Sequence, residues 1–254
     1  MRTDLDETFP RLAQAPIVEA VIDVWAKSGV RWEQAQFEPL FKARLPEYPT
    51  VQPQRRRSHT ATGQIETMIE QASPEFGWWG FIFRTADQSQ VAQFHREGFT
   101  FSRLAPYGRW EQFAREALRL GQIYFELARP AAIQRLDVRF INRMVLPLEE
   151  PRFEDYLTHA PRAPEAFALP VTSFFHQERF GMPEGGYAAQ IIRTVQAPEI
   201  TFPRVAVILD IDVFTTSPIE PLVGVLEQRL AEMRRLKNKL FFASITAKAL
   251  DTFK

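Results

Sequence analysis

The chain has 254 residues, of which 45% are hydrophobic and 24% charged, and its 31 basic side chains balance its 31 acidic ones. These fractions are typical of a globular protein, and the zero net charge provides no global field that would attract nucleic acid or an anionic membrane. The chain has no cysteine, which excludes disulfides, thiolate catalysis and cysteine-based metal sites. Its start is polar and acidic, unlike a signal peptide, and no stretch approaches the about 18 apolar residues of a membrane span. We therefore expect a soluble cytoplasmic protein.

The first half of the chain begins with a strand directly after Pro16. There Val18, Ala20, Ile22 and Val24 alternate with the residues between them, which is the period of a half-buried strand. The elements predicted next are a helix between 32 and 45 that Pro39 kinks or shortens, a hairpin around Gly63, a strand over 78–84, a hairpin at 97–98 and a helix over 110–127.

The same order of elements starts again near residue 132. Leu136, Val138 and Phe140 indicate a strand with one apolar face and one charged face. The elements predicted after it are a short helical piece at 153–157, a hairpin around 185–186, a strand over 204–214 and a helix over 222–242.

These elements predict an α+β fold of two topologically similar strand–helix–strands–helix halves, 16–130 and 131–254, after a polar leader over 1–15. Each long helix has one apolar stripe to bury, so the halves could pair into one curved, mostly antiparallel sheet with the long helices on one face. The halves share no obvious residue-level identity. Duplication is therefore a prediction about topology, within one compact unit.

Five short motifs occur together in this chain: APIVEAVIDV, FSRLAPYGRWEQF, RLDVRFINR, EDYL and RRLKNKLFFASIT. In this combination and order the chain resembles a sporadically distributed, functionally uncharacterised bacterial protein family, from about Pro16 to the C-terminus. The resemblance implies no established reaction. The patchy distribution of that family is similar to that of genes on mobile elements, including defence and toxin–antitoxin loci, so a protein partner encoded next door is one expectation.

Charged side chains are predicted to gather on the sheet face that the long helices leave open. The residues of this candidate binding face are Arg55, Arg57, His59, Arg135, Asp137, Arg139, Arg143, Asp210 and Asp212. If their strands are neighbours, the opposite charges form a cross-strand ladder. In such a ladder the charged side chains either only form salt bridges with one another or provide a polar binding surface. The run from 55 to 59 is either a solvated face or a contact for phosphate or an acidic partner.

Three motifs place aromatic or amide side chains beside basic ones. The candidate contact residues in them are Tyr107, Trp110, Asn142, Lys237 and Asn238. Tyr107 and Trp110 could stack on a base or another ligand, but a Trp at a helix start is also typical of an anchor between helix and sheet. Lys237 and Asn238 interrupt the stripe of the last helix, where cations complement the helix dipole or form a contact surface.

No motif in the chain indicates catalysis. The four histidines lack metal-ligand spacing, and the chain has neither a Gly-rich nucleotide loop nor a nucleophile elbow. We therefore expect no catalytic residue, no metal and no cofactor. Asp210 and Asp212 are the only carboxylate pair of interest for an enzyme.

The preferred interpretation is a non-enzymatic binding or regulatory protein that acts through another protein. The alternative is a nucleic-acid or nucleotide-binding sensor that uses the charged sheet face, although mixed charge disfavours an electrostatic grip on DNA. An exposed sheet edge or a patch of Phe side chains could also be closed by a second copy of the chain. No contact with a membrane is expected.

Overall fold

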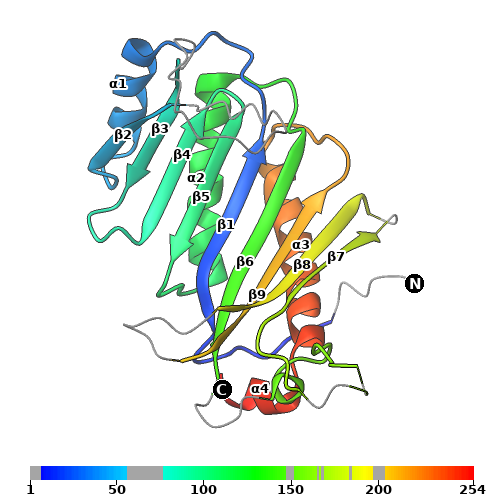
Figure 1. The fold of residues 1–254 in the computed structure, drawn as a ribbon. Helices are drawn as coiled ribbons and strands as arrows, with labels where there is room; N and C mark the ends of the chain where they lie inside the picture. The colour runs from blue at the N-terminus through cyan, green and yellow to red at the C-terminus, as the bar shows by residue number, and fades with distance from the viewer. Residues whose placement is uncertain are drawn as a thin grey trace, which may run out of the picture.

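The structure, a computed structural model, is an α+β fold built on one nine-stranded antiparallel sheet (Figure 1). It describes residues 7–55, 77–146, 152–164, 166, 169–182, 185–196 and 204–254. The order of the strands across the sheet is β2-β3-β4-β5-β1-β6-β9-β8-β7. The strands are β1 (Ile17–Trp25), β2 (Thr50–Arg55), β3 (Trp78–Arg84), β4 (Gln90–His95), β5 (Gly98–Leu104), β6 (Arg135–Val145), β7 (Phe175–Met182), β8 (Tyr187–Gln196) and β9 (Ala206–Thr215).

Three long helices and two short ones are present in the described residues. They are α1 (Gln34–Arg44), α2 (Trp110–Ala128), the 3-10 helix η1 (Phe153–Asp155), α3 (Val223–Ser244) and α4 (Ala247–Asp251). The helices predicted near 32–45, 110–127 and 222–242 are confirmed, and α1 continues through Pro39. The sequence did not predict α4. Among the described residues, no helix is both long and apolar enough to cross a membrane.

The hairpins predicted at 97–98 and 185–186 are confirmed as β4–β5 and β7–β8. The hairpin predicted around Gly63 lies outside the described residues. In the described part of the chain, β2 pairs directly with β3.

The apolar core lies between the sheet and the long helices, which pack against one face of it (Figure 1). Alternation in β1 turns Ala20, Ile22 and Val24 towards this covered face, where all three are fully buried. Rings from the helices fill the space above them. Phe41 of α1 stacks on Phe94 of β4 with ring centroids 4.4 Å apart.

The two halves of the chain meet in the middle of the sheet, where β1 pairs with β6. Outward from this pair the order is β5, β4, β3 and β2 on one side and β9, β8 and β7 on the other. In each half the first strand lies at the centre of the sheet and the second at its outer edge. The later strands then add one by one from the edge back towards the centre. The sheet face opposite the helices, here named the open face, crosses both halves and is turned to the viewer in Figure 1.

Candidate functional site

Alternation along three adjacent central strands brings charged side chains together on the open face. The strands that carry these charges, β1, β6 and β9, are neighbours in the sheet, so the condition for a cross-strand ladder is met. The register places Asp23 opposite Asp137 and Arg139 opposite Asp212. The open-face cluster, as the name is used below, consists of Asp23, Arg135, Asp137, Arg139, Asp210 and Asp212.

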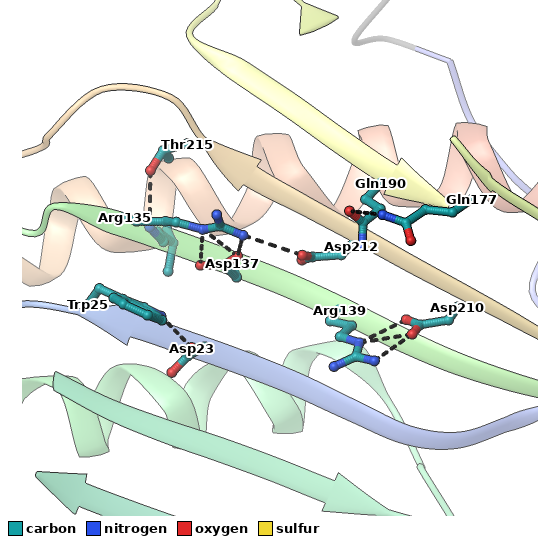
Figure 2. A network of polar contacts seen from close by, with 11 residues as sticks. Asp23, Trp25, Arg135, Asp137, Arg139, Gln177, Gln190, Asp210, Asp212 and Thr215 are labelled. Atoms are coloured by element: carbon teal, nitrogen blue, oxygen red, sulfur yellow. Dashed lines mark hydrogen bonds and ion pairs between the residues drawn. The ribbon is translucent and has the colours of Figure 1, made fainter. Parts of the chain in front are cut away.

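Two guanidinium groups each bind one carboxylate of the cluster (Figure 2). Arg135 Nε donates to the two oxygens of Asp137 at 2.7 and 3.0 Å, and Arg139 Nε donates to those of Asp210 at 2.9 and 3.1 Å. Both aspartates are only 7% exposed. Charge-assisted bonds to both oxygens stabilise such buried carboxylates. Because Arg139 reaches diagonally to Asp210, it does not bind Asp212, which lies directly opposite it.

Asp212 is the incompletely paired member of the cluster. Its Oδ2 lies 3.6 Å from Arg135 Nη2, whose stronger contact is with Asp137, and its Oδ1 is buried without any hydrogen-bond donor. Burial, followed by repulsion from the nearby Asp137 carboxylate, raises the pKa of Asp212 to about 7, and the two arginines oppose this rise. The Asp212 carboxyl therefore changes charge near neutral pH.

Asp23 is held by neutral donors. Thr100 Oγ1 and Trp25 Nε1 each donate to it at 2.6 Å, while the carboxylate directly opposite it is that of Asp137. Burial raises the pKa of Asp137, and its bonds with Arg135 oppose this rise. The Asp23 side chain is therefore satisfied by hydrogen bonds from neutral groups, and the charge of Arg135 acts on it without a direct ion pair among the described residues.

The cluster as a whole has more acids than bases, with four carboxylates against two guanidinium groups. Because Arg135 and Arg139 are engaged with Asp137 and Asp210, the excess negative charge belongs to Asp23 and Asp212. A partly buried site with unneutralised carboxylates favours a cation. The arrangement can therefore bind a basic group, and its charge disfavours phosphate.

The rim of the cluster is built from amphipathic side chains on β7, β8 and β9. Phe214 is buried beneath two guanidinium groups, with Arg135 Cζ 4.0 Å and Arg179 Cζ 4.9 Å from its ring centroid. Gln177 donates to Gln190 at 3.1 Å beside Asp212 (Figure 2). These contacts hold the arginines flat on the sheet and extend the polar surface towards β7.

Not every residue of the predicted face belongs to the cluster. Arg143 lies on the same face of β6 and donates to Gln196 at 2.7 Å. Arg55 ends β2, at the far edge of the sheet from β9, so the structure does not bring it to the cluster. Arg57 and His59 lie outside the described residues.

The predicted aromatic contact residues lie on the covered face. Tyr107 and Trp110 surround Phe140, with ring centroids 5.4 and 6.4 Å from it. Lys237 of α3 extends over the same ring, with Nζ 4.0 Å from the centroid. Trp110 therefore anchors α2 to the sheet, and this packing does not support a stacking role for Tyr107 and Trp110.

The remaining candidate contact residues, Asn142, Lys237 and Asn238, are buried or half-buried in the structure. Asn142 is buried and donates to the carbonyl oxygens of Phe140 and Leu209 at 3.2 and 3.0 Å. Lys237 is 9% exposed, and its neighbour Asn238 is half-buried. These positions do not support a surface role for Asn142 and Lys237.

Several residues of the site were not identified from the sequence. Trp25 and Phe214 continue the alternation of their strands, so the pattern alone could have placed them on the open face. Thr100 gave no such signal, because its contact with Asp23 depends on the pairing of β5 with β1.

A second feature that the sequence did not reveal is a pocket of about 680 Å³ beyond the end of β1. Its aromatic lining is Trp32, Trp78 and Trp79, and its cationic lining is Lys27, Arg31 and Arg96. Arg96 lies over the Trp78 ring at 5.8 Å, and Arg31 pairs with Glu33 at 3.2 Å. This volume is in the range of small-molecule sites.

Within the residues that the structure describes, no three carboxylate, imidazole or thiol groups are placed to share a metal ion. Asp210 is bound by Arg139, so it and Asp212 do not converge on a common point. No protein-family model, curated protein or solved structure matches the chain. The function is therefore argued from the geometry of its own residues.

Proposed function

We propose that the chain is a non-enzymatic binding protein that recognises a partner protein through a basic segment docked on the open-face cluster. The observation that carries this proposal is Asp212, a mostly buried carboxyl with one oxygen lacking a donor and no guanidinium of its own. An incoming Lys or Arg side chain supplies an opposite charge at the 17% of the Asp212 side chain that stays exposed. Charge-assisted hydrogen bonds of this kind are among the stronger polar contacts in interfaces.

The chemistry of the surroundings favours a protein over a nucleic acid. A phosphate backbone would approach two uncompensated carboxylates and would be repelled by them. The rim offers the guanidinium group of Arg179, held over the buried ring of Phe214, and the amide group of Gln177 side by side, and such polar groups are typical of the rim of a protein interface.

The test is affinity purification from extracts of the source cells. At pH 8 the immobilised chain is expected to recover one stoichiometric protein, and Asp212→Asn is expected to weaken its binding about tenfold. Glu227→Gln is the matched control, because Glu227 is an exposed carboxylate on α3, away from the open face. Equal loss in both variants, or no loss in Asp212→Asn, would contradict the proposal.

Binding is also expected to depend on pH. A cation at Asp212 favours the ionised carboxyl, whose pKa in the unbound protein is about 7. Affinity should therefore rise about tenfold between pH 6 and pH 8. The measurement is titration calorimetry with the recovered partner at both pH values. Asp212→Asn should show no such rise, and a pH-independent wild-type affinity would remove Asp212 from the interface.

Two other experimental outcomes would favour a function different from the recognition of a partner protein. Co-purifying absorbance at 260 nm that is lost at high salt would favour nucleic-acid binding. Thermal stabilisation by Mg²⁺ or Mn²⁺ that disappears in Asp210→Asn would favour a metal enzyme. The resemblance to a sporadically distributed bacterial family, whose patchy distribution is similar to that of genes on mobile elements, supports examining the product of the adjacent gene first as the partner.

The Trp-lined pocket supports a second candidate function, nucleotide binding. The partly exposed indole rings of Trp78 and Trp79 could stack on a base, and the three cations of the pocket outnumber Glu33 and Glu97 in the lining. Addition of ATP should quench tryptophan fluorescence, and Arg96→Ala should weaken this response. Arg115→Ala, an exposed change on α2, is the control. Absence of quenching at millimolar ATP would exclude this candidate.

We also propose that the two halves descend from one repeated module. The support is topological: β1, β5, β4, β3 and α2 in one half match β6, β9, β8, β7 and α3 in the other in order and place. A second structure of a relative with stronger identity between its halves would test this.

A further inference from the structure

We propose that two copies of the chain associate through strand β7, which pairs antiparallel with β7 of a second copy in a register centred on Gln177. The proposal does not depend on the function of the open-face cluster. Within the described residues, β7 pairs only with β8 and is the last strand at its edge of the sheet.

β7 differs from the rest of the sheet in how little it is covered. Seven of its eight residues are exposed, on both faces of the strand. Phe175 on one face is 62% exposed, and Phe180 on the other is 40% exposed. A long exposed edge strand with large apolar side chains is a template for pairing with another strand.

The opposite edge of the described sheet has a feature that blocks such pairing. β2 contains Pro53, which lacks an N–H and is one of the devices that protect edge strands. β7 contains no proline, and its charged residues Glu178 and Arg179 have opposite signs. The two edges therefore differ in their capacity to accept another strand.

The sequence of β7 is complementary to β7 of a second copy of the chain in the register centred on Gln177. Across a two-fold axis perpendicular to the sheet, directly opposite residues point to the same face, so the axis must pass through a residue pair of the same number. With the axis at Gln177, His176 faces Glu178 and Phe175 faces Arg179, and the symmetry forms each contact twice.

The two registers centred on the next residues along the strand, Glu178 and Arg179, are disfavoured by charge. An axis at Glu178 would place two carboxylates opposite each other, and an axis at Arg179 would do the same with two guanidinium groups. Like charges directly opposite destabilise a strand pair. In the register centred on Gln177, Glu178 would lie between His176 of the second copy and Arg193 of its own β8, which already binds it.

The dimer has one continuous sheet, and both open faces lie on the same side of it. A single strand pair buries less surface than a stable interface of standard size, so a micromolar dissociation constant is expected. Sedimentation of the full chain from about 1 to about 200 µM should show a transition from monomer to dimer.

The absence of natural cysteine makes the register directly testable. Opposite residues of an antiparallel pair have Cα atoms about 4.5–5.5 Å apart, within the range of a disulfide. Gln177→Cys should therefore form a covalent dimer on mild oxidation. Arg179→Cys should not, because the two copies of position 179 would lie roughly 13 Å apart.

A charge change tests the contacts themselves. His176→Glu places a carboxylate opposite Glu178 twice and should raise the dissociation constant about tenfold. His159→Glu, at an exposed histidine outside the sheet, should leave it unchanged. A monomer at every concentration would overturn the proposal and leave the edge to a strand of another protein. Equal cross-linking at positions 177 and 179 would overturn it as well.

Discussion

The covered and open faces of the sheet each contain an ionisable side chain whose pKa is displaced to about 7, from opposite directions. On the covered face, burial lowers the pKa of Lys237, and the nearby Arg234 adds to the effect. On the open face, burial raises the pKa of Asp212, and Asp137 adds to that effect. Desolvation disfavours the charged form of either group, and a like-charged neighbour reinforces it.

The comparison separates two consequences of the same physics. Lys237 lies against the Phe140 ring beneath a helix, so its charge state mainly affects folding stability. Asp212 lies beside solvent on a face that no long helix covers, so a ligand can supply the charge that the fold does not.

Removal of the ring on which the covered face depends should have the largest effect. Phe140 is 1% exposed and contacts Tyr107, Trp110 and Phe113. Phe140→Ala should lower the free energy of unfolding by about 3–5 kcal/mol, because it leaves a cavity. Chemical denaturation measures this change. A loss below about 1 kcal/mol would mean that the packing around Phe140 is not as described.

Replacement of the buried ammonium group should stabilise the protein. Lys237→Met keeps a straight side chain against Phe140 and removes a desolvated charge, for an expected gain of about 2–3 kcal/mol at pH 6. The folded-state pKa of Lys237 is about 7, below its ordinary 10.5. The penalty is therefore complete below pH 7 and disappears as the pH rises towards 10.5. Urea denaturation at pH 6 and pH 9 should show the gain shrinking. A constant gain would refute the charge as its cause.

Asp212→Asn should also raise the free energy of unfolding, but this gain should be smaller than that of Lys237→Met and should grow as the pH rises. The folded-state pKa of Asp212 is about 7, above its ordinary 3.8, so the penalty is absent below pH 3.8 and complete above pH 7. The variant should gain about 1–2 kcal/mol relative to wild type between pH 4.5 and pH 8, after allowance for solvent screening. Thermal denaturation at both pH values measures the difference.

Asp210→Asn is the matched control for that experiment. It removes the partner of Arg139 and should destabilise the protein at pH 8. Similar effects of the two substitutions would show that the cluster does not divide into a paired and an unpaired carboxylate.

An exposed contact at the rim should matter least. Trp25 is 52% exposed and donates to Asp23 through its indole nitrogen. Trp25→Phe keeps an aromatic ring and should change the free energy of unfolding by about 0.5 kcal/mol or less. A loss of several kcal/mol would show that the open face contributes to the core.

The sequence predicted the elements well because its periodicity is strong. Alternation in 17–25 and 206–215 assigned Asp23, Asp210 and Asp212 to one face, and the hairpin positions followed from their glycines. The sequence could not predict that Arg139 binds Asp210 diagonally, because side-chain pairing across a register is decided by rotamers and not by alternation.

For two of the candidate contact residues, Lys237 and Asn142, the sequence pattern itself indicated burial. In α3 the stripe of Leu226, Leu230 and Met233 continues four residues later at Lys237, which places the lysine in the core. Asn142 alternates with Phe140 and therefore points to the covered face. In both cases the burial follows from the position of the residue in the pattern and not from its polar type.

The central pairing of β1 with β6 has a consequence for biosynthesis. β1 leaves the ribosome with the first half of the chain, but the strand that covers its second edge is made only after α2 is complete. Until then β1 is an outer strand with an apolar face of Ala20, Ile22 and Val24. Nascent chains that stop before β6 should therefore be prone to aggregation. A pause in translation between α2 and the end of β6 would prolong this exposure of β1.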